Sequence, residues 1–246
     1  MKKLRIAAAV VTGIISSQAF ADGCNQLPSF QALQTALRQV VPASGAPNGG
    51  LGFPMWLTLV DGFGRVCAVT TSLAANGDVS SQIWLGSRVI SAQKANTANS
   101  FSTGALSLST ANLYAAVQPG GSLFGLQESN PVDTSAAYGG NVNAYGTPGD
   151  PMLGKQIGGV NVFGGGLTLY RAGKKIGAIG VSGDTSCTDH VVAWKVRNAL
   201  GLAGVPTFAF FDKMVQDLGT ADASGFGHPT CLNNPTADND GGAIVH

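Results

Sequence analysis

Three side chains that suit a flat, iron-bearing ligand recur at helical spacing near residue 190. Successive residues of an α-helix turn by about 100 degrees, so a helix here would present His190, Trp194 and Arg197 on one face. The core face would carry Val192, Val196, Ala199 and Leu200. An imidazole can ligate iron, an indole can stack on a flat ring, and a guanidinium can pair with a carboxylate. The positive end of the helix would favour a neutral His190. The alternative to a ligand site is that His190 is exposed in the first turn of the helix and that Trp194 packs in a subunit interface.

Two further side chains are candidates for the same site. His228 lies in a loop beside Cys231, where an imidazole is either a second metal ligand or a structural or exposed residue. Lys94 either contacts a phosphate or carboxylate or packs its stem on a sheet with a solvated tip. Asp189 follows Ser186 at the spacing of a helix cap. A capping role explains this residue without a catalytic one.

Motifs of other chemistries are incomplete in this sequence. The stretch 180–184 departs from the serine hydrolase elbow at its last residue, and neither a Walker loop nor a dinucleotide fingerprint occurs in the mature chain. Residues 238–241 resemble the middle of an EF-hand loop. The acidic residue that begins such a loop and the glutamate that ends it are both absent, which leaves only a looser calcium site. We find no acid and base pair and no nucleophile constellation, so we expect no enzyme.

The elements that position these residues can be predicted from periodicity and turn residues. We expect a helix capped by Ser29, a hairpin across Asp61 to Gly64, a second hairpin across Arg171 to Lys174, and two further helices. The predicted ranges are 30–41 (helix), 55–60 and 65–71 (strands), 82–101 (helix), 167–170 and 175–181 (strands) and 187–200 (helix). Helices and hairpins alternating in blocks favour an antiparallel α+β sheet.

Two regions have little periodicity. Residues 102–164 are rich in Gly, Asn and Ser, and so long a loop is typically functional, which makes it a lid over a ligand or an arm that holds a neighbouring subunit. Beyond Pro206, an aromatic group at 208–211 should anchor a C-terminal extension, 206–246, that is mostly loop after residue 220. We expect this extension to pack on the same domain.

The N-terminus and the composition indicate the compartment and exclude some partners. A basic start, an apolar run at 6–15 that is too short to span a bilayer, and small residues at Ala19 and Ala21 predict a secretory signal peptide over 1–21. The mature protein would be periplasmic or secreted, without stable membrane insertion. A net charge of +1 with 11% charged residues argues against nucleic-acid binding.

All four cysteines follow the predicted signal peptide. An even number in an oxidising compartment favours two disulfides over a zinc site, which lacks its usual spacing here. Of the three possible pairings, we favour Cys24 with Cys67 and Cys187 with Cys231, because that choice ties each terminal segment to the core.

Four motifs together resemble the heme-binding GlcG/HbpS family. They are Gly177-Ala-Ile-Gly-Val-Ser-Gly183 before a helix, Val60-Asp-Gly-x-Gly-Arg-Val66, Lys94-Ala-x-Thr-Ala98 and the glycine run 164–166, spread over roughly the middle two thirds of the chain. The resemblance implies a profilin-like, three-layer α/β/α fold with about five antiparallel strands over 22–205, the long loop being an insertion. It also implies a homo-oligomer.

The function that the resemblance implies is binding of heme or a related tetrapyrrole by an exported, non-catalytic protein, for heme sequestration, trafficking or sensing. The candidate binding residues are His190, Trp194, Arg197, Lys94 and His228, with the two histidines as candidate iron ligands. The alternative is a periplasmic accessory protein of a redox system without heme. That protein would dock through an exposed patch of Phe124, Tyr138 and Tyr145.

Overall fold

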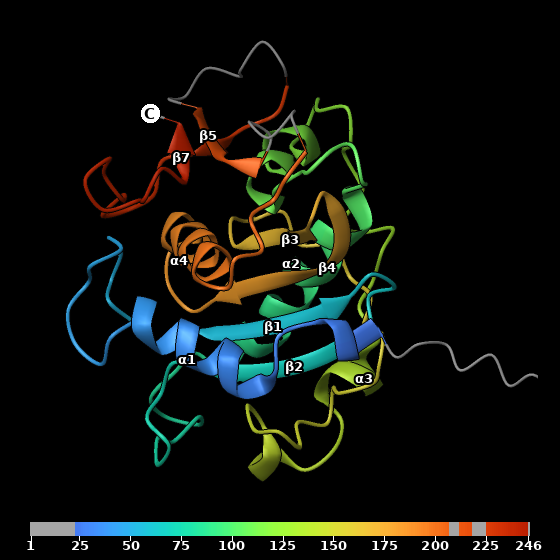
Figure 1. Cartoon of the computed structure of the whole chain (residues 1–246). Helices are drawn as coiled ribbons and strands as arrows, with labels where there is room; N and C mark the ends of the chain where they lie inside the picture. The colour runs from blue at the N-terminus through green and yellow to red at the C-terminus, as the bar shows by residue number, and fades with distance from the viewer. Residues whose placement is uncertain (1–22, 207–211, 218–224, 246) are drawn as a thin grey trace, which may run out of the picture.

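The main body of the protein is an antiparallel sheet with helices on both faces (Figure 1). The computed structural model describes residues 23–206, 212–217 and 225–245. Its main elements are α1 (Phe30–Val40), β1 (Trp56–Asp61), β2 (Val66–Thr71), α2 (Ser87–Phe101), β3 (Gly166–Arg171), β4 (Lys174–Ser182) and α4 (Ser186–Ala199). The strand order is β2-β1-β4-β3. The helix α2 covers one face, and α1 and α4 cover the other, so the three-layer α+β prediction is confirmed.

The sheet has four strands where about five were expected, because irregular segments occupy both of its edges. Beside β2, the Val66 amide donates to the Lys155 carbonyl (2.8 Å), and the Gly154 amide donates to the Val66 carbonyl (2.9 Å). Beside β3, the Tyr170 amide donates to the Leu202 carbonyl (3.0 Å). Each edge therefore has hydrogen-bond partners without another full strand.

Both predicted hairpins and the first helix form as expected. Ser29 caps α1, its hydroxyl accepting from the Ala32 amide at 3.2 Å. The buried side of α1 carries Leu33 and Leu37, which pack with the inner face of the sheet and with α4. The helix 82–101 begins later than predicted, at Ser87, because residues 78–82 fold into a separate turn in which Asp78 accepts from the Ser80 amide.

The last helix of the body also differs in detail from the prediction. Thr185, rather than Ser186, is the N-cap of α4, and its side chain accepts from the Thr188 amide. Ala199, expected in the core, is exposed. Asp189 still contributes to the helix start, because its Oδ1 accepts from the Asp184 amide at 3.0 Å.

The insertion 102–164 contains short elements of its own and packs in two parts. It includes η2 (Thr110–Leu113), η3 (Ala115–Val117), α3 (Thr134–Tyr138) and η4 (Val142–Ala144). The part up to about residue 128 lies beside the C-terminal segment, and the part with α3 lies at the opposite end of the body (Figure 1). A buried ion pair between Arg88 and Asp150 joins the second part to α2. Both parts of the insertion thus contribute residues to the core, although most of its residues are exposed or partly exposed.

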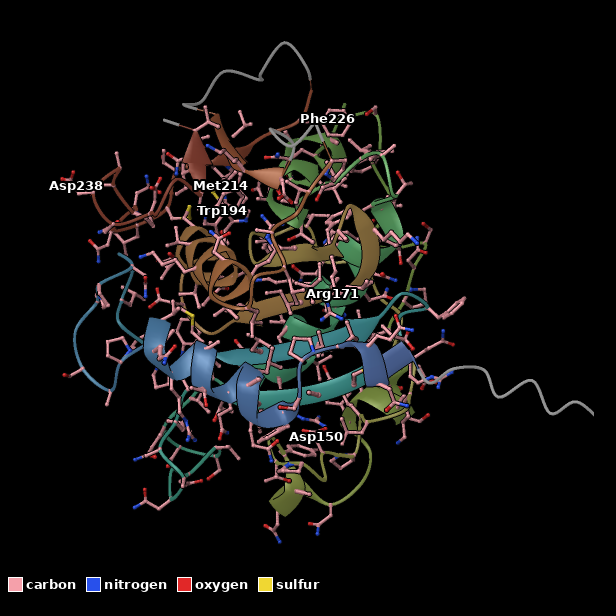
Figure 2. The ribbon with its side chains drawn as sticks, in the orientation of Figure 1. Asp150, Arg171, Trp194, Met214, Phe226 and Asp238 are labelled. Atoms are coloured by element: carbon pink, nitrogen blue, oxygen red, sulfur yellow. A yellow bond between two sulfur atoms is a disulfide. The ribbon has the colours of Figure 1, made fainter. Side chains whose placement is uncertain are left out.

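The C-terminal extension forms a small second sheet over one end of α4. Strand β5 (Met214–Asp217) pairs in parallel with β6 (His228–Pro229) and β7 (Ile244–Val245). Met214, Ala243 and Ile244 pack with Cys187 and Val191 of α4, and Figure 2 places Met214 next to Trp194. The predicted signal peptide and the aromatic group 208–211 lie outside the described residues. None of the described helices is long and apolar enough to cross a membrane.

Candidate functional site

The expected polar face of α4 is internal, because the C-terminal extension covers it. His190 and Arg197 are fully buried, and Trp194 is half-buried. Met214 and residues 226–245 lie over this end of the helix. The alternative that His190 is exposed in the first turn is therefore wrong: helical periodicity finds the shared face but not the segment that covers it.

His190 is a buried imidazole without a good hydrogen-bond partner. Neither of its ring nitrogens makes a hydrogen bond of normal geometry within the described part of the chain. Burial lowers the pKa of His190 to about 3; the charges of Arg197 and His228 act in the same direction, and the backbone of Ala243 opposes the shift. The ring is therefore neutral at pH 7, the form that ligates a metal. An unsatisfied, neutral imidazole is compatible with an iron ligand.

Lys94 and Asp189 form a buried ion pair between α2 and the first turn of α4. Lys94 Nζ lies 2.7 Å from Asp189 Oδ2 and also donates to the Val181 carbonyl at 3.1 Å. Burial raises the pKa of Asp189 to about 6 and lowers the pKa of Lys94, and in each case the partner opposes the shift. The solvated tip expected as the alternative for Lys94 is thus not observed.

The glycine run allows these side chains to come together. A Cβ on Gly165 would lie 3.2 Å from Lys94 Nζ and 3.1 Å from the Cβ of Asp189, and a Cβ on Gly164 would lie 2.9 Å from the Cβ of His190. Such separations leave no space for a side chain. The run 164–166 therefore lies directly against the Lys94, Asp189 and His190 cluster. Three consecutive glycines in the sequence already indicate a close approach of this kind.

Arg197 and Trp194 already have partners within the chain. Arg197 Nη2 lies 2.5 Å from Asp212 Oδ2, and Nη1 donates to the Thr168 carbonyl at 3.2 Å. The Trp194 indole donates to the Gly241 carbonyl at 3.1 Å, and Arg197 stacks 4.8 Å from the centre of its ring. The Asp212 partner was missed in the sequence because it lies in the aperiodic extension.

His228 belongs to a second group, which adjoins the first. Its Nε2 lies 2.9 Å from Ser186 Oγ, and its Nδ1 lies 2.7 Å from the Pro229 carbonyl. Because a carbonyl only accepts, Nδ1 carries the proton and Nε2 accepts from Ser186. Burial lowers the pKa of His228 to about 4. Both ring nitrogens are thus engaged, unlike those of His190.

Both favoured disulfides are present. Cys24–Cys67 joins the short helix η1 (Gly23–Gln26) to β2, and Cys187–Cys231 joins the first turn of α4 to the C-terminal extension. The described residues contain no free cysteine. The pairing prediction is confirmed, and each bond ties a terminal segment to the core.

Two hollows open elsewhere, on either side of the loop that follows β2. One, of about 340 Å³, lies between that loop and residues 42–54; the other, of about 220 Å³, is bordered by α1 and residues 145–148. Neither has a histidine among its lining residues. These two hollows therefore do not reach His190, which the C-terminal extension covers.

Comparison with solved structures finds distant likenesses. Klebsiella pneumoniae protein ORFY is 23% identical, with 71% of this chain and 90% of that chain covered and a TM-score of 0.45. The PduOC:heme complex is 24% identical, with 72% and 98% covered and a TM-score of 0.46. A double mutant of Streptomyces reticuli HbpS is 16% identical, with 81% and 99% covered and a TM-score of 0.43.

The comparison with protein families identifies the fold family. A search of curated proteins finds no match. The model of the family described as "Haem degrading protein HbpS-like" matches residues 51–197, more than half of the chain. The match runs from the first hairpin to Arg197 of α4, and it includes the glycine run and the cluster above it. The chain therefore belongs to the HbpS-like family.

Proposed function

We propose that this protein binds heme or a related tetrapyrrole after export, without turning it over, and acts in heme sequestration, trafficking or sensing. The HbpS-like family match supports a heme ligand. The observation that carries the proposal is His190, a buried and neutral imidazole whose ring nitrogens make no hydrogen bond of normal geometry within the described residues. Leaving such polar atoms without partners is costly in a protein interior, and metal ligation is one use that explains it.

His190 is the proposed iron ligand, and its neighbours position it. Bound heme would supply the iron that the imidazole ligates and a flat surface that suits stacking by Trp194. Lys94 and Arg197 each face a buried carboxylate, so we assign them to holding α4 in place rather than to the ligand. Both ring nitrogens of His228 have partners, Ser186 and Pro229, so His228 is not part of the proposed ligand set.

Access to His190 requires the C-terminal extension to move. The segment packs over α4 through Met214 and Ile244 and through polar contacts that include the hydrogen bonds from Trp194 to Gly241 and from Lys195 to Asn239. The Cys187–Cys231 disulfide also holds it at one point, so opening has to be partial or follow cleavage of that bond. We therefore propose that heme binds a form in which the extension has lifted.

A hemin titration tests the proposal. Hemin is added to the purified mature protein and the Soret band is followed, with His190→Ala beside His228→Gln as the matched histidine control. The proposal predicts a saturable shift in the wild type and in His228→Gln, and its loss in His190→Ala. Absence of a saturable shift in the wild type would remove the heme proposal. Decay of the band with a reductant present would indicate degradation instead of binding alone.

The accessory-protein alternative now rests on a different surface from the one expected. Phe124 and Tyr138 are exposed but belong to opposite ends of the molecule, and Tyr145 packs on Arg88 at 3.7 Å. An exposed aromatic pair instead forms from Phe53 and Trp84, with ring centres 4.9 Å apart. Homo-oligomerisation stays a prediction, which light scattering of the purified protein would check.

A further inference from the structure

The disulfide between Cys187 and Cys231 is surrounded by groups that stabilise a thiolate. Cys231 Sγ accepts the backbone N–H of Cys187 at 3.2 Å, and Ser186 Oγ lies 3.5 Å from the same sulfur. Cys187 is the second residue of α4, where the positive helix end favours negative charge on sulfur. The Gln216 amide lies 3.8 Å from Cys187 Sγ. Charge left on either sulfur after cleavage would thus be stabilised by N–H groups and by the helix end.

Ser186 and His228 provide a route for a proton. His228 Nδ1 donates to the Pro229 carbonyl, so Nε2 accepts from the Ser186 hydroxyl. The lone pairs of Ser186 Oγ are then available to a thiol at Cys231. During exchange a proton can pass from a thiol at Cys231 to Ser186 while the Ser186 proton passes to His228; because the pKa of His228 is about 4, this transfer is transient and leaves no lasting ion pair.

The other disulfide provides an internal contrast. Cys24 and Cys67 have the Asp61 carboxylate in the same cluster, with all three ligand atoms within 4.8 Å of one another. Cys67 Sγ also lies 3.5 Å from the Arg65 carbonyl. These oxygens disfavour a thiolate. Cys187 Sγ also has a carbonyl neighbour, that of Pro229 at 3.7 Å, so the difference between the two sites is the carboxylate of Asp61. The two bonds join residues 43 and 44 positions apart, so loop closure does not distinguish them.

We propose that Cys187–Cys231 is a thiol-exchange site that takes a dithiol as its reductant. One thiolate of the dithiol attacks Cys231 Sγ, which is partly exposed, whereas Cys187 is fully buried. The new bond forms to Cys231, the Cys187–Cys231 bond breaks, and its electron pair leaves on Cys187. The second thiolate of the dithiol then closes an internal disulfide and releases Cys231. The dithiol loses two electrons, the protein disulfide gains them, and the two dithiol protons complete the two protein thiols.

Exchange at this position would loosen the extension over α4. The bond is the covalent link between the first turn of α4 and residues 226–245, which lie over His190. After reduction, side-chain packing and the hydrogen bonds of Trp194 and Lys195 still hold this segment. The site would therefore couple the redox state of its surroundings to the exposure of His190.

The first experiment treats the oxidised, full-length mature chain with glutathione, followed by acid quenching and peptide mass spectrometry. We expect the adduct on Cys231, and exchange at least tenfold faster than at Cys24–Cys67. Ser186→Ala should slow the exchange about threefold or more. Ser87→Ala, which replaces the first residue of α2, should leave the rate unchanged. An adduct on Cys187, or equal rates at the two disulfides, would overturn the proposal.

A second measurement separates the proton route from a structural role. In the reduced protein at pH 7, Cys231 should be alkylated faster than a thiol with the ordinary pKa of about 8.5. The rate should fall in His228→Gln, which keeps an acceptor but cannot take a proton. An unchanged rate in that variant removes the role of His228. Hydrogen exchange in residues 187–193 should rise about tenfold on reduction, and no rise means that the extension is not loosened. Hemin is absent throughout, so these outcomes are distinct from failure of the proposed function.

Discussion

The backbone of Gly164 lies so close to His190 that a Cβ added to the glycine would be 2.9 Å from the Cβ of the histidine. The same atom would be 2.3 Å from the Ser186 carbonyl and 2.6 Å from the end of Met214. The glycine therefore sets how closely α4 and the C-terminal extension approach the strand that follows it. His190 is buried as a consequence of that contact.

Replacing Gly164 with alanine should destabilise the protein. The added methyl group must displace the start of α4 or the extension, at a cost of about 1–3 kcal/mol. Urea unfolding at pH 7 measures the change. Gly104→Ala is the control, because no atom lies within 4 Å of its added Cβ. Equal stability of the two variants would show that the contact is not tight.

The stability of the protein should fall as the pH drops below about 6.5, partly because of His190. Its pKa is lowered from 6.5 to about 3 in the folded state, so the folded protein binds fewer protons than the unfolded chain between these values. Its contribution is fully present above pH 6.5 and is lost toward pH 3, at up to about 1.4 kcal/mol per pH unit. His190→Gln should flatten the curve of unfolding free energy against pH between 4 and 6.5. Parallel curves for variant and wild type would contradict this.

Asp189 should act in the opposite direction over a similar range. Its pKa is raised from 3.8 to about 6, so the folded state holds the proton longer, and the stability that this contributes is lost as the pH rises from about 4 to 6. Asp189→Asn should therefore steepen the rise of stability with pH over that range. Chemical unfolding at half-unit pH steps measures the slopes. A flatter profile in the variant would mean that Asp189 adds stability, rather than removing it, as the pH rises.

Removing one member of the buried Lys94 and Asp189 pair should cost more than removing both charges. Lys94→Met leaves Asp189 buried without its cation, an effect of about 3–5 kcal/mol. The double variant with Asp189→Asn removes the charge and keeps an acceptor for the Asp184 amide, so at least half of the loss should return. The exposed Lys174→Met is the surface control, with a change within about 0.5 kcal/mol. A double variant as unstable as Lys94→Met would argue against a charge effect.

Hemin should reach His190 faster when the extension is not covalently held. The double variant Cys187→Ser with Cys231→Ser is compared with Cys24→Ser with Cys67→Ser by stopped-flow absorbance in the Soret region. We expect association at least threefold faster in the first variant and an unchanged rate in the second. Equal rates in both would show that the disulfide does not limit access.

Local patterns in the sequence predict local structure well in this protein. Ser29 and the apolar spacing after it identify α1, and the turn residues at 61–64 and 171–174 identify both hairpins. The disulfides follow from the number of cysteines and from the positions of Cys24 and Cys231 near the two ends of the mature chain. Each of these features depends on neighbouring residues or on a very small number of alternatives.

The environment of the candidate site could not be predicted in the same way. Helical spacing groups His190 with Arg197, but the segment that buries them carries no periodic pattern, and Asp212 is distant in the sequence. The partner of Lys94 is 95 residues away. A buried charge has no local signature, because its carboxylate partner comes from elsewhere in the fold. The three consecutive glycines were the available signal for close approach.

The occupied edges of the main sheet restrict how copies of this protein can assemble. Val66 on one outer strand and Tyr170 on the other already exchange backbone hydrogen bonds with residues of their own chain. At these positions a neighbouring molecule cannot continue the sheet by adding a strand. An assembly would instead have to form through helix and loop surfaces, so its contacts would be set by side chains and would respond to single substitutions there.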